Sequence, residues 1–340
     1  MLSKREQSQF LQQVSRSFAL SIPLLNKDLE DVIANAYLLC RIADTIEDNP
    51  KACLLFKIKW LEDFAHLCDE LFDDDNLIDD LVLRAKIIKD SAVFCEYELL
   101  TKLKDVTLRT KSFDKNYLII VAKGVSILSR GMAEHLSFVA NKSLDDVDSY
   151  CYAVAGVVGE MLARLFALNE NIDALSKAQL VDMSVSFGEG LQLTNILKDR
   201  SEDIKRGVTF LAPLDNFKDK PKSFSALSDV SAYICITYGH LLDAIDFVCK
   251  LPKDKSGTRM FCLVNIIMAI LTLNKIAKNP QAEQSLLKIS RQDVYRIFIY
   301  CKVFKNCNFL VKLLARRAGS DLKPLRRDFK DLYEKVSKWN

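Results

Sequence analysis

The sequence predicts an all-α protein, and three observations support that prediction. Only 10 glycines and 7 prolines interrupt 340 residues, which suits long helices better than many short strands. No segment shows the alternating apolar and polar residues of a half-buried strand. With 49% hydrophobic and 27% charged residues, the chain can bury a substantial core and does not have the composition of a disordered protein. We expect one all-α domain over residues 1–340, because no linker divides the sequence.

The composition also excludes several classes of function. A net charge of +3 is too small to indicate a nucleic-acid-binding protein. The ten cysteines lack C-x-x-C pairs and the three histidines lack zinc-ligand spacing, so we expect free thiols in a reducing, cytoplasmic compartment. The longest apolar run, residues 261–273, is shorter than the ~18–20 residues of a membrane span. We therefore expect a buried helix there and no transmembrane helix.

The first feature along the chain is an arginine between two hydroxyl residues, Ser15-Arg16-Ser17. Such a group can bind a phosphate through charge-assisted hydrogen bonds. The alternative is a helix cap followed by a surface arginine, and this stretch alone favours that alternative.

A helix is predicted from about residue 28 to residue 48, since this segment holds no glycine or proline and stops at Asn49-Pro50. Residues three or four apart share a helix face, so one stripe carries a guanidinium and several carboxylates among apolar residues. The stripe consists of Tyr37, Arg41, Asp44 and Asp48, with Glu47 beside it. Carboxylates crowded on a half-buried face repel one another and need cations. Mg²⁺ takes oxygen ligands and often binds together with a phosphate, so this stripe is a candidate magnesium site.

The middle of the chain is predicted to be helical as well. We interpret the acidic run at residues 73–76 as a solvated loop between helices, and we expect an amphipathic helix over residues 116–139. Small residues at 153, 155, 156 and 159 permit close approach of another helix or of an apolar ligand. Tyr150 shares a helix face with Val154. A buried tyrosine is more often a packed, hydrogen-bonded core residue than a catalyst, so the stretch alone leaves its role open.

The spacing D-x-x-E-D of residues 44–48 occurs a second time, at Asp199, Glu202 and Asp203. Gln192 and Asn195 precede it on the same helical stripe. One copy alone is compatible with a solvated acidic helix face, whereas two copies among apolar residues favour a shared function. We expect the two acidic faces to line opposite walls of one cavity and to hold Mg²⁺ between them.

The last third of the chain is predicted to contain helices over residues 227–250 and 259–278, followed by basic helices from about residue 284. The basic residues gather towards the end of the chain, from Arg316 to Lys338. A basic amphipathic segment can contact an anionic membrane surface. A solvated charged face is the alternative, and the residues alone favour it.

Four stretches together resemble the squalene/phytoene synthase family. They are Ser15-Arg16-Ser17-Phe18, residues 37–48, residues 150–159 and residues 192–203. Their order and spacing match the family from about residue 10 to residue 280, while residues 281–340 resemble it only in being helical. Within the family, the likeness is closest to the squalene-forming members, the farnesyl-diphosphate farnesyltransferases of isoprenoid biosynthesis.

This resemblance implies an isoprenoid synthase fold with helices around a central cavity. It also implies a Mg²⁺-dependent head-to-head condensation of two farnesyl diphosphates to presqualene diphosphate, followed by NADPH-dependent reduction to squalene. By the same resemblance, the carboxylates of both acidic motifs would hold Mg²⁺, namely Asp44, Glu47, Asp48, Asp199, Glu202 and Asp203.

The resemblance assigns roles to further residues. The positions that help bind the diphosphates match Arg16, Arg41, Gln192 and Asn195. Tyr150 matches the proton acceptor of the family, and Tyr37 lines the same site. Apolar substrate contacts are implied for Phe18, Val154, Phe261 and Cys262, and contacts to the phosphates of NADPH for Ser15, Arg16 and Tyr37.

Two positions depart from the family pattern. Val208 follows Gly207 where the family has an arginine, and Lys198 stands where an arginine is common, which removes the bidentate geometry of a guanidinium. The chain also lacks a G-x-G-x-x-G motif, although the family binds NADPH without one.

Several alternative functions stay open at this point. The alternatives are a dehydrosqualene synthase, which needs no reductant, an enzyme whose final product is presqualene diphosphate, and a phytoene synthase, which uses C20 substrates. A non-catalytic helical binding protein is a different class, which the paired acidic motifs disfavour. We expect farnesyl diphosphate as the partner, no nucleic acid, and at most peripheral contact with the inner membrane surface.

Overall fold

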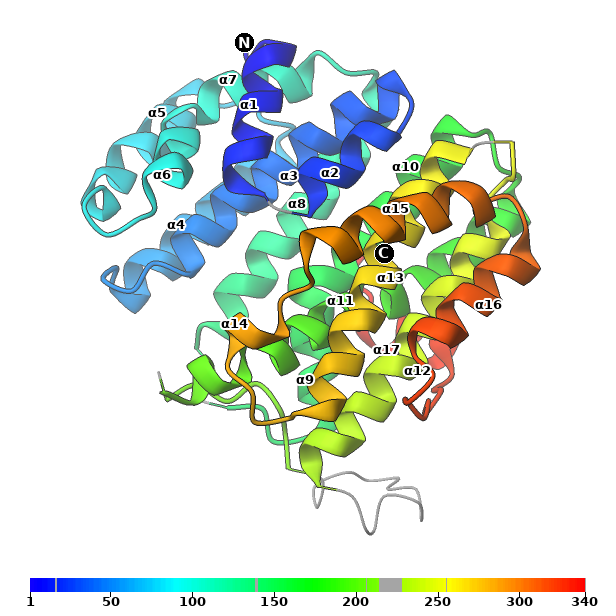
Figure 1. The fold of residues 1–340 in the computed structure, drawn as a ribbon. Coiled ribbons are helices and arrows are strands. Elements are labelled where there is room, and N and C mark those ends of the chain that lie inside the picture. The colour runs from blue at the N-terminus through cyan, green and yellow to red at the C-terminus, as the bar shows by residue number, and fades with distance from the viewer. Residues whose placement is uncertain (16, 138–139, 206, 214–227, 255, 340) are drawn as a thin grey trace. The chain divides into compact units, whose positions relative to one another are not determined.

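The protein is built from helices, as the sequence predicts (Figure 1). The computed structural model describes the whole chain apart from residues 16, 138–139, 206, 214–227, 255 and 340. Within that described part there are α-helices, two short 3₁₀-helices and one π-helical turn, and no strand. The expected all-α fold class is therefore confirmed.

Contacts between residues divide the chain into two compact units. Unit 1 comprises Met1–Phe138 together with Arg164–Asn169 and Lys338–Asn340, and unit 2 comprises Val139–Ala163 and Glu170–Ser337. The prediction of a single domain stays a prediction.

Unit 1 is organised around α3 (Lys27–Glu47), which contacts α1, α4, α6, α7 and α8. The other elements of this unit are α1 (Lys4–Val14), α2 (Phe18–Ser21), η1 (Ile22–Leu24), α4 (Leu54–Asp69), α5 (Asp75–Arg84), η2 (Ala85–Ile88), α6 (Phe94–Thr101), α7 (Leu103–Lys111) and α8 (Lys115–His135). Because α3 is surrounded by helices, most of its apolar side chains are fully buried.

The sequence of α3 explains both of its ends. The side chain of Asn26 accepts a hydrogen bond from the backbone N–H of Leu29, which caps the helix start. Asp28 and Glu30 in the first turn interact favourably with the positive end of the helix dipole. The helix ends at Glu47, two residues before Asn49-Pro50, so the predicted segment 28–48 is confirmed to within one residue.

The acidic run at residues 73–76 is not a loop throughout, and that interpretation was wrong in part. Asp74 accepts a hydrogen bond from the backbone N–H of Leu77 at 2.9 Å and caps α5, whose first residue is Asp75. Asp73 pairs with Lys111 at 2.7 Å. Aspartates favour helix starts because they satisfy unpaired N–H groups there, and this effect outweighed the loop-forming tendency of the run.

Unit 2 is organised around the long helix α11 (Ala174–Lys205), which contacts α12, α13, α17 and η3. The other elements are α9 (Leu144–Cys151), η3 (Tyr152–Gly156), α12 (Asp229–Lys250), α13 (Ser256–Lys278), α14 (Gln284–Leu287), α15 (Arg291–Phe304), α16 (Asn308–Ala318) and α17 (Phe329–Val336). Helix α10 (Val157–Asn169) belongs to unit 2 as far as Ala163 and to unit 1 from Arg164 on. The helices predicted over 227–250 and 259–278 correspond to α12 and α13 and are confirmed.

Two glycines allow η3 and α10 to approach α11 closely. A Cβ atom on Gly159 would lie 2.3 Å from the backbone oxygen of Ser184, and one on Gly188 would lie 2.3 Å from that of Ala155. No side chain fits at such a distance, so these positions require glycine. The prediction that small residues near 153–159 permit close helix approach is confirmed.

Among the described residues, three helical stretches are long and apolar enough to cross a membrane, judged by length and composition alone: Leu144–Asn169, Asp229–Lys250 and Gly257–Lys278. The prediction of no transmembrane helix rests on uninterrupted apolar runs. These stretches are longer because they include a few polar residues within an apolar window of 18 positions. Between 72% and 78% of each apolar window is buried inside the protein, so packing accounts for their hydrophobicity. The expected absence of a transmembrane helix stays a prediction.

Candidate active site

In unit 1, a chain of hydrogen bonds orders the predicted stripe on α3. The hydroxyl of Tyr37 donates to the backbone oxygen of Val14 at 3.1 Å and accepts from the Arg41 guanidinium at 3.0 Å. Arg41 in turn lies 3.5 Å from the carboxylate of Asp44. Burial alone would lower the pKa of Arg41, but Asp44 and the Tyr37 hydroxyl outweigh that effect, so the guanidinium stays charged. Its Nε has no hydrogen-bond partner among the described residues.

The carboxylates of the first motif are crowded at the end of α3. Burial, together with neighbouring carboxylates, raises the pKa of Asp44 from 3.8 to about 7 and that of Glu47 from 4.5 to about 8. Asp44 keeps 29% of its side chain exposed, so an ion from solvent can reach it. Carboxylates held close together in a poorly solvated place are stabilised by a cation, and oxygen donors of this kind suit Mg²⁺. The donor set therefore fits the predicted metal.

The first motif has two charged neighbours that the sequence reading missed. Glu96 of α6 lies 3.8 Å from Arg41, and burial raises the pKa of Glu96. The ammonium group of Lys57 of α4 donates to the backbone oxygen of Glu47 at 2.6 Å, and Lys57 is close enough to Glu47 and Asp48 to favour their charged forms. Both residues come from other helices, so no local spacing could have indicated them.

The segment before α3 places two more of the predicted residues. Phe18 packs against Tyr37 with ring centroids 5.5 Å apart. The Oγ of Ser15 accepts a hydrogen bond from the backbone N–H of Phe18 at 3.1 Å, which leaves its hydroxyl hydrogen able to donate to a phosphate. Arg16 lies outside the described residues, so its predicted phosphate contact is not addressed by the structure.

In unit 2, the second motif occupies the end of α11. The Asp199 carboxylate accepts a hydrogen bond from the Gln284 side chain of α14 at 2.5 Å and lies 3.5 Å from Lys198. Lys198 also donates to the Asn195 side chain at 3.0 Å. Lys198, which stands where an arginine is common in the family, thus bridges the predicted residues Asn195 and Asp199. Gln284 is a further neighbour that sequence spacing did not reveal.

The remaining polar residues of this stripe are Gln192, Glu202 and Asp203, which lie on the same helix. Across the described residues, no three His, Cys, Asp or Glu side chains are close enough to one another to hold a metal ion as a ready-made group. Each motif by itself is thus a partial ligand set. Their joint action on Mg²⁺ stays a prediction.

The departure from the family at Val208 follows a sharp helix end. Gly207 adopts φ = 76°, a left-handed conformation that glycine tolerates best, and the Val208 N–H bonds back to the Asp203 oxygen at 2.9 Å. This is how helices commonly terminate. The chain leaves α11 here with an exposed valine, and Arg206 lies outside the part of the chain that the structure describes.

Tyr150 is held by an aromatic neighbour on the same unit. Its ring stacks on Phe210 with centroids 4.9 Å apart and an interplanar angle of 20°, and the Phe210 backbone oxygen accepts from Asn141 at 2.6 Å. Val154 follows Tyr150 by about one helical turn and lies in the π-helical turn η3. Such turns occur frequently at functional sites. The sequence reading found Tyr150 but neither Phe210 nor the π-turn.

The two residues predicted to form an apolar wall lie deep in the core of unit 2. Phe261 and Cys262 on α13 are both buried, and burial raises the pKa of the Cys262 thiol well above its ordinary value. An unionised, buried thiol behaves as a small apolar group. All ten cysteines are free, as expected.

A charged clamp fixes α9, the helix that carries Tyr150. Arg327 forms two hydrogen bonds with the Asp148 carboxylate, at 2.7 and 2.6 Å, and Asp148 is only 2% exposed. Further along, the buried carboxylate of Glu160 accepts hydrogen bonds from Tyr333 at 3.1 Å and Ser337 at 3.0 Å. The end of the chain is therefore attached to the elements around Tyr150, although it shows no family motif.

Comparison with known proteins places this arrangement in a family. A family model for squalene/phytoene synthase matches residues 11–293. The chain belongs to the squalene/phytoene synthase family. The squalene synthase of Candida albicans is 29% identical over 311 residues, which cover 86% of this chain and 66% of that protein. This chain thus spans about two thirds of the length of that relative.

Solved structures of the family share the fold. The complex of TcSQS with the ligand E5700 aligns with a TM-score of 0.74 at 23% identity, over 98% of this chain and 95% of that chain. A dehydrosqualene synthase in complex with ligand aligns with a TM-score of 0.55 at 19% identity, over 88% and 95% of the two chains. These likenesses concern the fold, and they support the isoprenoid synthase architecture expected from the motifs.

Proposed function

We propose that this member of the squalene/phytoene synthase family joins two farnesyl diphosphates head to head and reduces the product to squalene. The observation that carries the proposal is the pair of acidic motifs, each at the end of a helix and each accompanied by polar residues on the same stripe. Relatives with the printed name squalene synthase support the choice of substrate. The activity is that of a transferase, a farnesyl-diphosphate farnesyltransferase.

Mg²⁺ would be held by the carboxylates of Asp44, Glu47, Asp48, Asp199, Glu202 and Asp203. Bound there, it would supply positive charge to the departing diphosphate, which is what the reaction needs most. The Arg41 guanidinium, whose side chain is 26% exposed, adds a charged donor for a diphosphate oxygen. Gln192 and Asn195 would add neutral donors from α11, and Lys198 adds a second positive charge beside Asp199.

The apolar residues would keep the reacting carbons away from water. Loss of diphosphate leaves an allylic cation, which water would quench, so the site must be dry. Phe18 beside Tyr37, and Val154, Phe261 and Cys262 in unit 2, are suited to that task. Tyr150, held against Phe210, is the group we propose for the proton transfer that closes the cyclopropane ring of presqualene diphosphate.

The role of Tyr150 predicts the effect of removing its hydroxyl. Tyr150→Phe keeps the ring and its stacking on Phe210, so folding should be unchanged. We expect turnover of farnesyl diphosphate to fall by about 10²- to 10⁴-fold, the usual contribution of a positioned proton acceptor. The exposed Tyr295 provides a matched control, because Tyr295→Phe removes the same hydroxyl from α15. Equal turnover in Tyr150→Phe and wild type would make Tyr150 a packing residue.

NADPH supplies the hydride for the second half-reaction when it is bound. Ser15 keeps a hydroxyl hydrogen for a cofactor phosphate, whereas the Tyr37 hydroxyl already donates to Val14. We therefore favour Ser15 over Tyr37 as a phosphate donor and place Tyr37 as the group that positions Arg41. The predicted contact of Arg16 with the cofactor stays a prediction.

The product distinguishes this proposal from the related activities. We expect purified protein with farnesyl diphosphate and Mg²⁺ to make squalene only when NADPH is added, and to release presqualene diphosphate, dehydrosqualene or alcohols without it. Chromatography of the products with and without NADPH tests this. The same product in both reactions would support a dehydrosqualene or presqualene diphosphate synthase instead, and consumption of geranylgeranyl diphosphate alone would support a phytoene synthase.

The location of the protein is also part of the proposal. We place it in the cytoplasm, where ten free cysteines stay reduced, with peripheral contact to the inner membrane surface. The basic residues Arg326 and Arg327 are engaged within unit 2, by Asp246 and Asp148. Because both are paired, membrane contact needs basic residues other than Arg326 and Arg327.

A further inference from the structure

Two neighbouring helices of unit 2 expose an unusual number of large apolar side chains. On α15, Tyr295 is 68% exposed and Val303 is 67% exposed, and on α16, Phe309 is 73% and Leu313 is 50% exposed. Ile299 and Tyr300 of α15 are exposed as well. Single exposed apolar residues are ordinary, but a group of six on two consecutive helices marks an interaction surface. We call these six residues the α15–α16 face.

The opposite sides of both helices show how this face is oriented. Ile297 and Cys301 of α15 and Val311 and Ala315 of α16 are buried, and the two helices contact each other as well as α13, with α16 also against α12. Because the buried residues occupy one side of each helix, the exposed apolar side chains of the α15–α16 face lie on the side turned away from α12 and α13. Packing within unit 2 does not account for them.

The charge of this segment is concentrated and positive. Residues 291–318 contain seven basic residues and one acidic residue, whereas the whole chain has a net charge of only +3. On α16, Lys312 and Arg316 form a stripe next to that of Phe309 and Leu313, because residues three or four apart are neighbours on a helix. Exposed apolar side chains bordered by cations are typical of segments that bind the interface of an anionic membrane.

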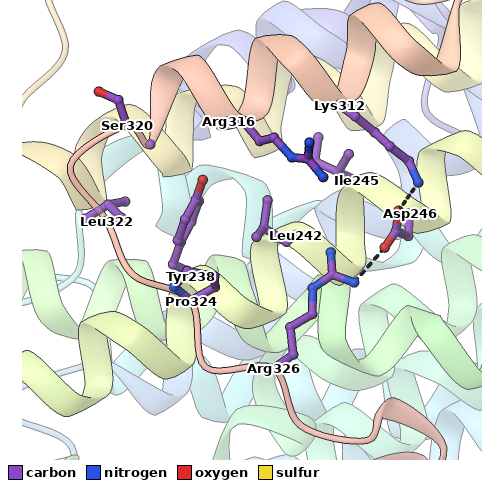
Figure 2. A pocket seen from close by; sticks show the side chains of 11 residues that line it. Tyr238, Leu242, Ile245, Asp246, Lys312, Arg316, Ser320, Leu322, Pro324 and Arg326 are labelled. Atoms are coloured by element: carbon purple, nitrogen blue, oxygen red, sulfur yellow. Dashed lines mark hydrogen bonds and ion pairs between the residues drawn. The ribbon is translucent and has the colours of Figure 1, made fainter. Parts of the chain in front are cut away.

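A cavity beside the α15–α16 face extends the positive stripe. It has a volume of about 500 Å³ and lies between α12, α16 and residues 319–326. Figure 2 shows Lys312 and Arg326 directed at Asp246, which lies 2.8 Å from each, with Arg316 at the same cavity. Arg316 forms no salt bridge with any described residue. Three cations and a single carboxylate line the cavity, so it is suited to a phosphate group.

We propose that the α15–α16 face binds the surface of a membrane that contains anionic phospholipids, with a headgroup phosphate beside Arg316 in this cavity. The apolar side chains would insert at the level of the headgroups while the basic residues meet lipid phosphates. The proposal rests on the proposed function only in that an apolar C30 product needs a lipid phase to receive it. The surface itself is inferred from exposure and charge.

The test is vesicle flotation with the full chain and no substrate. Wild type should float with vesicles of phosphatidylcholine and phosphatidylserine at low salt, and less so at high salt, while vesicles of phosphatidylcholine alone should bind it poorly. Phe309→Ser with Leu313→Ser should lower the bound fraction at least about tenfold, and Arg316→Ala should lower it about fivefold. Leu175→Ser is the matched control for the apolar pair, because Leu175 is 71% exposed on α11, outside the α15–α16 face, and it should bind like wild type.

Three results would overturn the proposal. They are no flotation of wild type with anionic vesicles, unchanged flotation of the Phe309→Ser, Leu313→Ser variant, and a wild-type dimer that this variant converts to monomer while neither binds vesicles. Unchanged flotation of Arg316→Ala would overturn the headgroup site alone. Turnover of farnesyl diphosphate in detergent is measured in parallel, and we expect it to be equal in all variants. Loss of vesicle binding with full turnover, or the reverse, separates failure of this inference from failure of the proposed function.

Discussion

Replacing Asp44 by asparagine should lower turnover of farnesyl diphosphate by about 100- to 1,000-fold, the usual loss when one group that stabilises developing charge is removed. The carboxylate of Asp44 is proposed to hold Mg²⁺, and an amide of the same shape carries no charge. Asp199→Asn should have an effect of similar size, since the second motif is proposed to act on the same substrate. Steady-state kinetics with farnesyl diphosphate at saturating Mg²⁺ measures both.

The same variant should be at least as stable as wild type in the absence of metal. The pKa of Asp44 is about 7 in the folded protein and 3.8 ordinarily, so between these values the folded state binds more protons than the unfolded state. Stability contributed by this group therefore falls as pH rises from about 4 to 7, and above pH 7 the charged carboxylate destabilises the fold. Asparagine does not titrate, so Asp44→Asn should unfold at an equal or higher temperature than metal-free wild type at pH 8.

Two controls make this prediction specific. Glu98→Gln changes an exposed carboxylate on α6 to an amide and should alter neither turnover nor thermal unfolding. Added Mg²⁺ should raise the unfolding temperature of wild type by mass action but raise that of Asp44→Asn much less. Normal turnover in Asp44→Asn, or a clear loss of metal-free stability at pH 8, would show that Asp44 is a structural residue.

The second large effect is expected at the other end of the chain. Arg327→Ala removes the two short hydrogen bonds of Asp148, a buried carboxylate whose other cation, Lys335, lies 3.7 Å away. Breaking such a buried pair on one side costs about 3–5 kcal/mol. For a protein of 340 residues the unfolding temperature should fall by roughly 4–7 °C. Differential scanning calorimetry at pH 7 measures the change.

The pattern of variants tests whether the buried charge is the cause. Adding Asp148→Asn to Arg327→Ala should recover part of the lost stability, because no charge is then left unpaired. Lys330→Ala is the control, since its pair with Glu334 is exposed and 3.7 Å apart, and such pairs contribute little. Because α9 also carries Tyr150, Arg327→Ala should have a lower turnover than wild type even at temperatures at which the variant is still folded. Full stability of Arg327→Ala would show that the C-terminal segment is not a clamp.

The helices were predictable where their local sequence was sufficient. Asn26 and the stop at Asn49-Pro50 define α3, and long apolar periodicity defines α12 and α13. The start of α5 differs from the prediction, because a run of aspartates indicates a solvated loop by composition, whereas Asp74 caps the helix. Capping depends on one hydrogen bond to a residue three positions on, which composition alone does not reveal.

The site was predictable only in its helical stripes. Spacing of three and four residues identified Asp44 and Asp199 without any structure, because a helix brings such residues to one face. Their partners were not predictable: Glu96 and Gln284 come from other helices, and pairing across elements leaves no pattern in a single sequence. The sequence places Arg327 in a basic surface segment, whereas the structure pairs it, half-buried, with the buried Asp148, because sequence does not tell a solvated arginine from one paired with a buried carboxylate.

The central claim is that the chain converts farnesyl diphosphate to a C30 product by a reaction that depends on Mg²⁺ and on both acidic motifs. The most direct measurement is the transfer of radiolabel from farnesyl diphosphate into a hexane-soluble C30 hydrocarbon, with Mg²⁺ and NADPH present. We predict rapid transfer by wild type, none in excess EDTA, and at least a hundredfold slower transfer by Asp44→Asn and by Asp199→Asn. Transfer that is unaffected by EDTA, or that persists at the wild-type rate in either variant, would contradict the account.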